Sequence, residues 1–263
     1  MEPFAGGAGV ALSLLYGEYV SHIHINDLDK SVHAFWSAVV GNTEGLCRLI
    51  RDTPLNLPEW RRQRAIQSRR EEVDSLTLAF STFFLNRTNR SGIIASGGII
   101  GGLKQAGTYK LDARFNRSEL INRIEHVASY RNRISLYQLD AVDMLGAVVQ
   151  DLPSESLVYL DPPYYVKGSR LYANYYEHAD HERLASKVKN LRQHWFVTYD
   201  DVRPIRKMYR SFRSSVYGLQ YSACSRVVGS EVMFFSDTLR VPSHPRPSAI
   251  RSECESLHLS HRS

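Results

Sequence analysis

Residues 156–166 read SLVYLDPPYYV, an apolar run that breaks into an acid, two prolines and two tyrosines. The apolar part, residues 157–160, has no helical spacing and predicts a short buried strand. The prolines end that strand, because neither can donate a backbone N–H and both fix φ. Asp161 and Tyr164 are therefore predicted to lie on a stiff turn at the carboxyl end of a strand, where open α/β sheets bind ligands. An ordinary surface Asp-Pro turn would contain the same residues, so the rest of the chain has to decide between the two interpretations.

The amino-terminal region predicts the start of a doubly wound sheet. The segment EPFAGGAGVALSLLYG, which begins at Glu2, predicts the end of a strand, a glycine-rich turn and a helix from about Val10. Residues 20–27, VSHIHIND, alternate in polarity and predict a second strand that ends at Asp27. Residues 28–51 continue with the apolar spacing of a helix. This order of elements is typical of the Rossmann-like α/β class.

The region from 52 to 125 has a different character. It is dense in arginine at first, then predicts an apolar helix, and continues as a long loop rich in Gly, Lys and Arg, IIASGGIIGGLKQAGTYKLDARFNR. Long ordered loops in compact domains usually carry a function, so we expect an inserted recognition region here. A further helix is predicted in SELINRIEHVASYRNR, with Ser118 as its expected cap.

The carboxyl-terminal half returns to alternating strands and helices. A strand is predicted to end at Asp140, and further elements are expected in WFVTYDD, in VRPIRKMY and in a terminal hairpin up to Ser236. Beyond that residue the chain turns to Ser, Pro, Arg and His, which predicts disorder. The predicted organisation is the first part of an α/β core at residues 1–51, an insertion at 52–125, the second part of the core at 126–236 and a disordered tail at 237–263.

Composition narrows the classes of function. The 263 residues are 43% hydrophobic, which suffices for a core, and the formal net charge of +6 favours a polyanionic partner. The three cysteines form no CxxC pair and no Cys/His cluster, so neither a disulfide framework nor a structural zinc is expected. No apolar stretch approaches the roughly 20 residues that cross a bilayer, and no secretory signal begins the sequence. We expect a soluble intracellular protein.

The glycine-rich turn and the acids at strand ends predict a nucleoside site. Glycines let a ligand approach the backbone, and an acid at the end of the next strand accepts hydrogen bonds from ribose hydroxyls. Gly9 and Asp27 have nearly the spacing of about twenty residues that this arrangement uses. The chain lacks a GxxxxGK[ST] phosphate loop, and FAGGAG is not a full GxGxxG, so a nucleoside without a pyrophosphate fits better, with S-adenosylmethionine as the candidate. A tight turn without a ligand, and a helix-capping role for Asp27, remain alternatives.

Two motifs resemble the hallmarks of the Dam-like DNA adenine-N6 methyltransferases, EPFxGxG and DPPY. Here they are EPFAGGAG at residues 2–9 and DPPY at residues 161–164. Further similarity runs through FLNRTNRSGI, YKLDARFNR and GSEVMFFS, so the resemblance covers nearly the whole chain except its tail. It implies the Rossmann-like α/β fold of S-adenosylmethionine-dependent methyltransferases with an inserted DNA-recognition region, S-adenosylmethionine as cofactor and double-stranded DNA as substrate. It further implies a monomer that uses no metal and no membrane and acts in the cytoplasm.

The resemblance also implies roles for individual residues. The carboxylate of Asp161 and the carbonyl of Pro162 would accept the two N–H bonds of the target amino group, and Tyr164 would stack on an adenine flipped out of the duplex before direct methyl transfer. Asp27 would bind the ribose, and Asp140 the adenine of the cofactor, with Asp143 as the competing choice. The implied catalytic set is Asp161, Pro162, Pro163 and Tyr164, and the implied cofactor set is Glu2, Pro3, Phe4, Gly6, Gly7, Gly9, Asp27 and Asp140.

The basic insertion is the expected DNA contact region, because phosphates bind Arg and Lys and base edges bind Arg, Asn or Gln. The arginines between residues 61 and 70 are equally compatible with an ordinary solvated face. The candidate DNA contacts are Arg87, Asn89, Arg90, Lys104, Gln105, Arg114 and Arg117.

The chain departs from the family pattern ahead of the glycine-rich turn, where family members carry a first strand and a Gly-Ser or Gly-Lys motif near the cofactor's methionine end. We therefore expect either a truncated reading of an active methyltransferase or a decayed, inactive relative that binds DNA. Methylation of RNA or of a protein glutamine is a further alternative. Those relatives typically open their proline-proline-aromatic turn with Asn, and the segments around Arg87 and Arg114 favour DNA.

Overall fold

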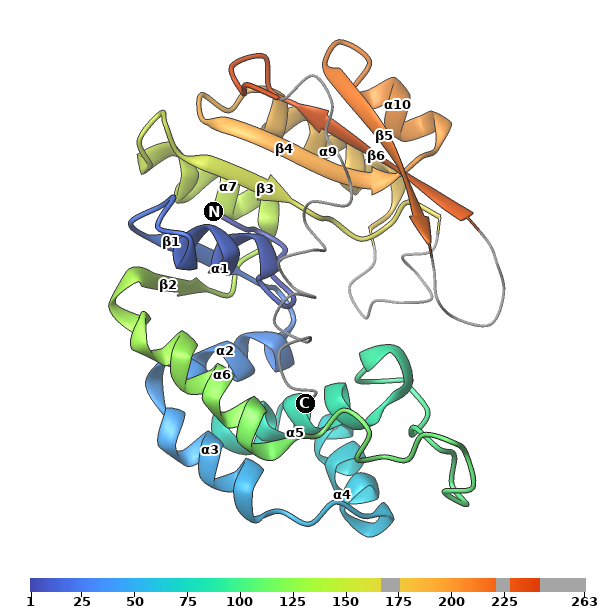
Figure 1. Ribbon diagram of the computed structural model, residues 1–263. Coiled ribbons are helices and arrows are strands. Elements are labelled where there is room, and N and C mark those ends of the chain that lie inside the picture. The colour runs from blue at the N-terminus through green and yellow to red at the C-terminus, as the bar shows by residue number, and fades with distance from the viewer. Residues whose placement is uncertain (167–175, 221–227, 242–263) are drawn as a thin grey trace, which may run out of the picture.

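The computed structural model describes residues 1–166, 176–220 and 228–241 of the chain (Figure 1). Helical and sheet-rich parts lie at opposite ends of the molecule, and the elements nearest the amino terminus lie between them. The helices are α1 (Gly9–Tyr16), α2 (Lys30–Gly41), α3 (Thr43–Asp52), α4 (Leu57–Ser68), α5 (Ser75–Thr88), α6 (Arg117–Ser129), α7 (Ala141–Ala147), α9 (His178–Lys189) and α10 (Arg203–Met208). The strands are β1 (Ile23–Asn26), β2 (Ile134–Tyr137), β3 (Leu157–Leu160), β4 (His194–Asp200), β5 (Arg213–Gln220) and β6 (Val228–Phe235).

The described strands form two small sheets that are joined by the first residues of the chain. In one sheet β1 and β2 pair in parallel, and in the other the order is β3-β4-β6-β5, with β6 antiparallel to both neighbours. On one side the Glu2 N–H donates to the His24 carbonyl at 2.9 Å, and on the other the Tyr159 N–H donates to the Met1 carbonyl at 2.9 Å. The predicted α/β class is therefore confirmed as a mixed α/β structure, although two small sheets stand where one continuous sheet was expected.

The order of the strands creates a switch point at residues 1–2. From there the chain passes through α1 to β1 and then β2 on one side, whereas β3 and β4 lie on the other side. Helices that leave neighbouring parallel strands in opposite directions open a crevice at the carboxyl ends of those strands, and ligands of open α/β sheets bind there. The topology therefore predicts a binding site where residues 2–10, the end of β1 and the end of β3 meet.

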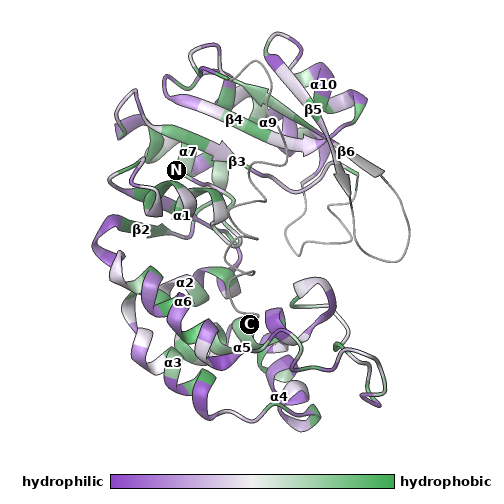
Figure 2. Cartoon of the chain, in the orientation of Figure 1, coloured by the Kyte–Doolittle hydropathy of each residue, from purple (hydrophilic) through white to green (hydrophobic). Residues whose placement is uncertain are grey.

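The sheet β3-β4-β6-β5 has a core of its own. Val158 and Leu160 of β3 and Val197 of β4 have no exposed surface, and they pack with Leu184 and Val188 of α9. Figure 2 shows hydrophobic residues along β3, where the buried Val158 and Leu160 alternate with the partly exposed Leu157 and Tyr159. This packing fixes the end of β3, and with it the DPPY turn that follows.

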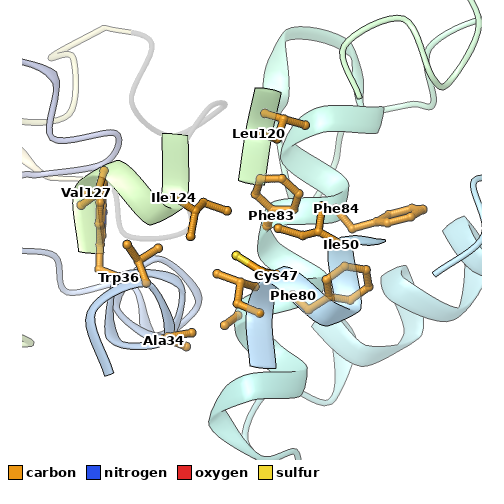
Figure 3. Close-up of a cluster of buried hydrophobic side chains, with 14 of the residues drawn as sticks. Ala34, Trp36, Cys47, Ile50, Phe80, Phe83, Phe84, Leu120, Ile124 and Val127 are labelled. Atoms are coloured by element: carbon orange, nitrogen blue, oxygen red, sulfur yellow. The ribbon is translucent and has the colours of Figure 1, made fainter. Parts of the chain in front are cut away.

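The helical part has a second core, rich in aromatic rings. Helices α2, α3, α5 and α6 contribute to it, and Figure 3 shows Trp36, Phe83 and Phe84 among its members. The predicted boundary after residue 51 falls at the last residues of α3, and the one after residue 125 falls inside α6. Helices on both sides of these boundaries share one core, so the division into core and insertion stays a prediction.

Two local predictions were wrong, both because a nearby asparagine caps a helix. The single helix expected at 28–51 is two helices, since Asn42 ends α2 and its side chain accepts a hydrogen bond from the Gly45 N–H at 3.2 Å to begin α3. Likewise Ser118 is not the cap of α6, because Asn116 holds that position and accepts from the Glu119 N–H. The other expected helices and strands are present within a few residues of their predicted bounds.

No helix in the described ranges is long and apolar enough to span a membrane. The predicted tail at 237–263 lies mostly outside the described residues, which end at 241.

The aromatic core gives a direct test of the helical part. Phe84 has no exposed surface, and its ring lies 5.8 Å from that of Phe80 and 5.6 Å from that of Phe115, measured between centroids. Phe84→Ala should lower the free energy of unfolding by about 3–5 kcal/mol in urea titration. Tyr109→Ala, at a side chain that is 72% exposed, should change it by no more than about 0.5 kcal/mol. Equal effects from the two substitutions would contradict this description of the core.

Candidate active site

A cavity of about 410 Å³ lies at the switch point, within the size range of small-ligand sites. Its walls come from residues 2–10, from residues 26–29 at the end of β1, from the start of α7 and from the end of β3. Tyr176 lines another side of the cavity, and its ring packs edge-on against that of Phe4, with 5.8 Å between the ring centroids. The predicted glycine-rich turn, Asp27 and Asp161 therefore share one cavity.

The glycine-rich turn is shaped as an open cradle. Gly6 has φ of +47° and the following Ala8 has φ of +50°, so the chain turns sharply before α1 begins. A Cβ atom on Gly6, Gly7 or Gly9 would meet no atom within 4 Å. These positions therefore border empty space, and a ligand can approach the backbone there.

Asp27 braces this turn and still has acceptor capacity. Its Oδ2 accepts a hydrogen bond from the Gly6 N–H at 2.9 Å, and its Oδ1 accepts from the Asp29 N–H at 2.9 Å. Each carboxylate oxygen can accept a second bond, so two hydroxyl donors could still be bound. Burial raises the pKa of Asp27 despite these two bonds. The helix-capping alternative for Asp27 does not hold, since Asp29 is the cap of α2.

The buried residues Glu2 and Asn26 hold the floor of the cavity. Glu2 accepts a hydrogen bond from the Ala11 N–H at 2.9 Å and so fixes the first turn of α1. The Asn26 amide donates to the Pro3 carbonyl at 2.8 Å and to the Leu139 carbonyl at 3.0 Å, and it accepts from the Leu139 N–H at 2.8 Å. Asn26 therefore ties the turn at Pro3 to the segment that follows β2.

Burial raises the pKa of Glu2 from 4.5 to about 7, which makes its effect on stability dependent on pH. Between these two values the native state keeps a proton that the unfolded chain releases, so the free energy of unfolding falls as the pH rises. Glu2→Gln keeps an acceptor for the Ala11 N–H but cannot ionise. From pH 4.5 to about pH 8, urea titrations should show the variant gaining about 3 kcal/mol of stability relative to wild type. A constant difference across that range would contradict the raised pKa.

The DPPY turn brings Asp161 to the edge of the cavity. Asp161 is open to the cavity, yet the surrounding protein excludes enough water that burial raises its pKa. Its Oδ1 accepts a hydrogen bond from the Thr198 hydroxyl of β4 at 2.7 Å, and that hydroxyl lies 3.3 Å from the hydroxyl of Tyr159. Pro163 also lines the cavity, whereas Pro162 and Tyr164 lie outside its lining.

Polar groups of the neighbouring strands hold the residues that follow Asp161. The Tyr164 hydroxyl donates to Glu231 of β6, and the Tyr217 hydroxyl of β5 donates to the same carboxylate. Asp200, at the end of β4, accepts hydrogen bonds from the backbone N–H groups of residues 165 and 166 at 2.8 and 3.1 Å. The turn is therefore anchored on both sides of its prolines.

Asp140 does not line the cavity, and its carboxylate instead caps the amino terminus of α7. It caps α7 by accepting a hydrogen bond from the Val142 N–H at 2.9 Å. Asp143, the competing choice, lies in the first turn of α7 and is likewise absent from the lining. The lining instead contains Leu28 and Leu139, whose side chains are 43% and 37% exposed. Sequence reasoning missed both. The position of Leu28 directly after a strand-end acid would have been a signal, whereas Leu139 precedes Asp140.

The candidate DNA contacts differ in their exposure and in the hydrogen bonds that they form within the protein. Arg90 and Lys104 are exposed, and Arg87 is half-buried, with burial and the nearby Arg114 lowering its pKa. Within the described part of the chain, the Arg87 Nε is buried without a hydrogen-bond partner. Arg90 and Lys104 therefore present exposed cationic groups to solvent, whereas the Arg87 Nε is enclosed by the protein.

The side chains of the other four candidates form hydrogen bonds within the protein. Asn89 is fully buried and bonds to Trp60 at 2.7 Å and to the carbonyl of residue 93, and the Gln105 amide bonds three backbone groups of its own loop. Arg114 donates to the carbonyls of residues 86 and 89, both at 2.6 Å. Arg117 donates to the last carbonyls of α3 and to that of Thr53 at 2.7 Å. The structure therefore gives these side chains a structural use, which the sequence pattern does not distinguish from DNA contact.

Comparisons with known proteins place the chain. Among solved structures it is similar to protein LPL1258 from Legionella pneumophila str. Philadelphia 1, family-model DUF519, with 15% identity over 73% of this chain and 72% of that chain and a TM-score of 0.32. That similarity is too low to support an argument. No curated protein matches the chain. The family model for D12 class N6 adenine-specific DNA methyltransferase matches residues 1–222, which is most of the 263 residues. The chain therefore belongs to the D12 class of N6 adenine-specific DNA methyltransferases.

Proposed function

We propose that the cavity binds S-adenosylmethionine and that Asp161 presents a flipped adenine of double-stranded DNA to it for methylation at N6. The observation that carries this proposal is the shared cavity: the glycine cradle, Asp27 and Asp161 all border it. The family supports adenine methylation in general. The proposal adds the cofactor, its site and the residues that act.

The residues of the cavity fit this cofactor. The cradle of Gly6, Gly7 and Gly9 leaves room for a ligand against the backbone, and Asp27 has acceptor sites for two ribose hydroxyls. The exposed apolar side chains of Leu28 and Leu139 offer a surface for a flat base. When bound, S-adenosylmethionine supplies a methyl group activated by its positively charged sulfur.

The DPPY turn would hold the target adenine beside that methyl group. The amino group of adenine is a weak nucleophile, because its lone pair is delocalised into the ring. The second carboxylate oxygen of Asp161 and the carbonyl of Pro162 would accept its two N–H bonds and localise the lone pair toward the cofactor. Tyr164 would stack on the flipped base, a contact worth about 1–3 kcal/mol. Positioning, rather than a covalent enzyme intermediate, supplies the rate enhancement.

DNA would be bound by the helical part, which we propose as the recognition region. Of the seven candidate side chains, we propose the exposed Arg90 and Lys104 and the half-buried Arg87 for contact with phosphates. Binding through such contacts should weaken as the salt concentration rises, because counterions are released from the phosphates. We propose the cytoplasm as the compartment of action, where a bacterial or phage DNA substrate is accessible.

The proposal is tested by methyl transfer from labelled S-adenosylmethionine to unmethylated duplex DNA, followed by nucleoside analysis. Label in N6-methyladenine supports it. Label found only in cytosine or only in RNA would show that the substrate differs from the proposed one. Binding of DNA without any methyl transfer would favour the inactive, DNA-binding alternative.

A further inference from the structure

We infer that Thr198 is a positioning residue that aims the Asp161 carboxylate at the target amino group. This inference rests on the proposed function, in which Asp161 accepts an N–H of adenine. Thr198 touches neither the cofactor nor the base in that proposal, and it acts only through Asp161.

The strand register brings the two side chains together. In the parallel pair of β3 and β4, Tyr159 lies opposite Phe196 and Leu160 opposite Val197. Continuing that register by one residue puts Thr198 beside Asp161. The Thr198 side chain is 6% exposed, and its Oγ1 lies 2.7 Å from the Asp161 Oδ1. The contact is therefore set by the pairing of two buried strands.

The direction of the hydrogen bond follows from the groups involved. A hydroxyl has one proton to donate, and an ionised carboxylate can only accept. The Thr198 hydroxyl therefore donates to Asp161, and it can accept from the Tyr159 hydroxyl at 3.3 Å. The carbonyl of Leu160, at 3.4 Å, is the more distant acceptor. Tyr159, Thr198 and Asp161 form a chain that ends on one carboxylate oxygen and leaves the other for substrate.

The same bond acts on the charge of Asp161. Burial and the nearby Glu231 raise the pKa of Asp161, whereas the hydrogen bond from Thr198 lowers it. Removing the Thr198 hydroxyl should therefore raise this pKa further and leave less carboxylate to accept the amino group at a given pH. Among the described residues, the titratable groups that interact with Asp161 include Glu231 of β6, Glu2 at the amino terminus, Tyr159 of β3, Tyr199 of β4 and Tyr217 of β5.

The test compares three variants of the full chain. Thr198→Val removes the hydroxyl at constant size and should lower kcat roughly 10–100-fold, the loss expected for a hydrogen bond to a charged group. The KM values for S-adenosylmethionine and DNA should change little, and the acid limb of the kcat–pH profile should move to higher pH. Thr198→Ser should restore most of kcat. Thr82→Val is the matched control, since it removes a buried hydroxyl that donates to the Leu78 carbonyl within α5 at 2.8 Å.

A second measurement separates this inference from the proposed function. The Asp161 carboxyl group is titrated by 13C NMR in wild type and in Thr198→Val, without any need for turnover. A higher pKa in the variant supports the inference even if wild type transfers no methyl group. The inference would be overturned by an unchanged pKa of Asp161, or by a kcat loss in Thr198→Val that Thr198→Ser does not restore. Methyl transfer by the wild-type protein would still support the proposed function in that case.

Discussion

Asp161→Ala should abolish most methyl transfer while the protein still binds S-adenosylmethionine. In the proposed mechanism the Asp161 carboxylate accepts an N–H of the target amino group, and losing one such preorganised interaction typically costs about 10²–10³-fold in kcat. Single-turnover rates with saturating cofactor and DNA measure this loss. The cofactor affinity should be nearly unchanged, because the ribose and base contacts are assigned to other residues.

Asp161→Asn is the matched control for that experiment. It keeps the size of the side chain and an oxygen acceptor but loses the negative charge, so we expect a rate between those of wild type and Asp161→Ala. Asp161→Ala with a wild-type kcat would contradict the assigned role. Loss of cofactor binding in that variant would instead make Asp161 part of the cofactor site.

Asp27→Ala should weaken the binding of S-adenosylmethionine about 100-fold or more in calorimetric titration. Hydrogen bonds to charged groups contribute about 1.5–3 kcal/mol each, and two ribose hydroxyls would lose this acceptor. The variant also removes the bond from Asp27 to the Gly6 N–H, which holds the cradle. Tight binding should therefore not survive the substitution.

Asp140→Ala is the matched control for Asp27→Ala. Both acids follow strands, and both accept a hydrogen bond from the backbone N–H two residues later, Asp27 from Asp29 and Asp140 from Val142. Only Asp27 lines the cavity. Asp140→Ala should therefore change cofactor affinity much less than Asp27→Ala, and comparable losses from the two variants would return Asp140 to the cofactor site.

The parts of the fold that the sequence predicted depend on short-range signals. Short patterns of apolar residues, glycines and prolines predict three elements: the DPPY strand, the glycine-rich turn before α1 and the strand ending near Asp27. Their convergence on one cavity followed from the rule that ligands bind at the carboxyl ends of parallel strands. Ser118 was misassigned as a cap because Asn116, two residues earlier, is an equally good capping residue.

The remaining features depend on long-range pairing that one sequence does not specify. An acid before a helix can be a cap or a ligand contact, so Asp27 and Asp140 looked alike although only one borders the cavity. The Arg117 guanidinium donates hydrogen bonds to carbonyls at and just after the end of α3, which have no partner within that helix. These carbonyls lie 64 residues or more from Arg117 in the sequence. The contact of Thr198 with Asp161 likewise needs the register of β3 and β4.

The proposed cofactor site is tested most directly by a crystal structure of the chain with S-adenosylhomocysteine, the demethylated cofactor. We expect the ligand in the cavity at the switch point, with its ribose hydroxyls on Asp27 and its sulfur facing the open side of Asp161. A ligand bound elsewhere, or bound in this cavity with its ribose away from Asp27, would contradict it.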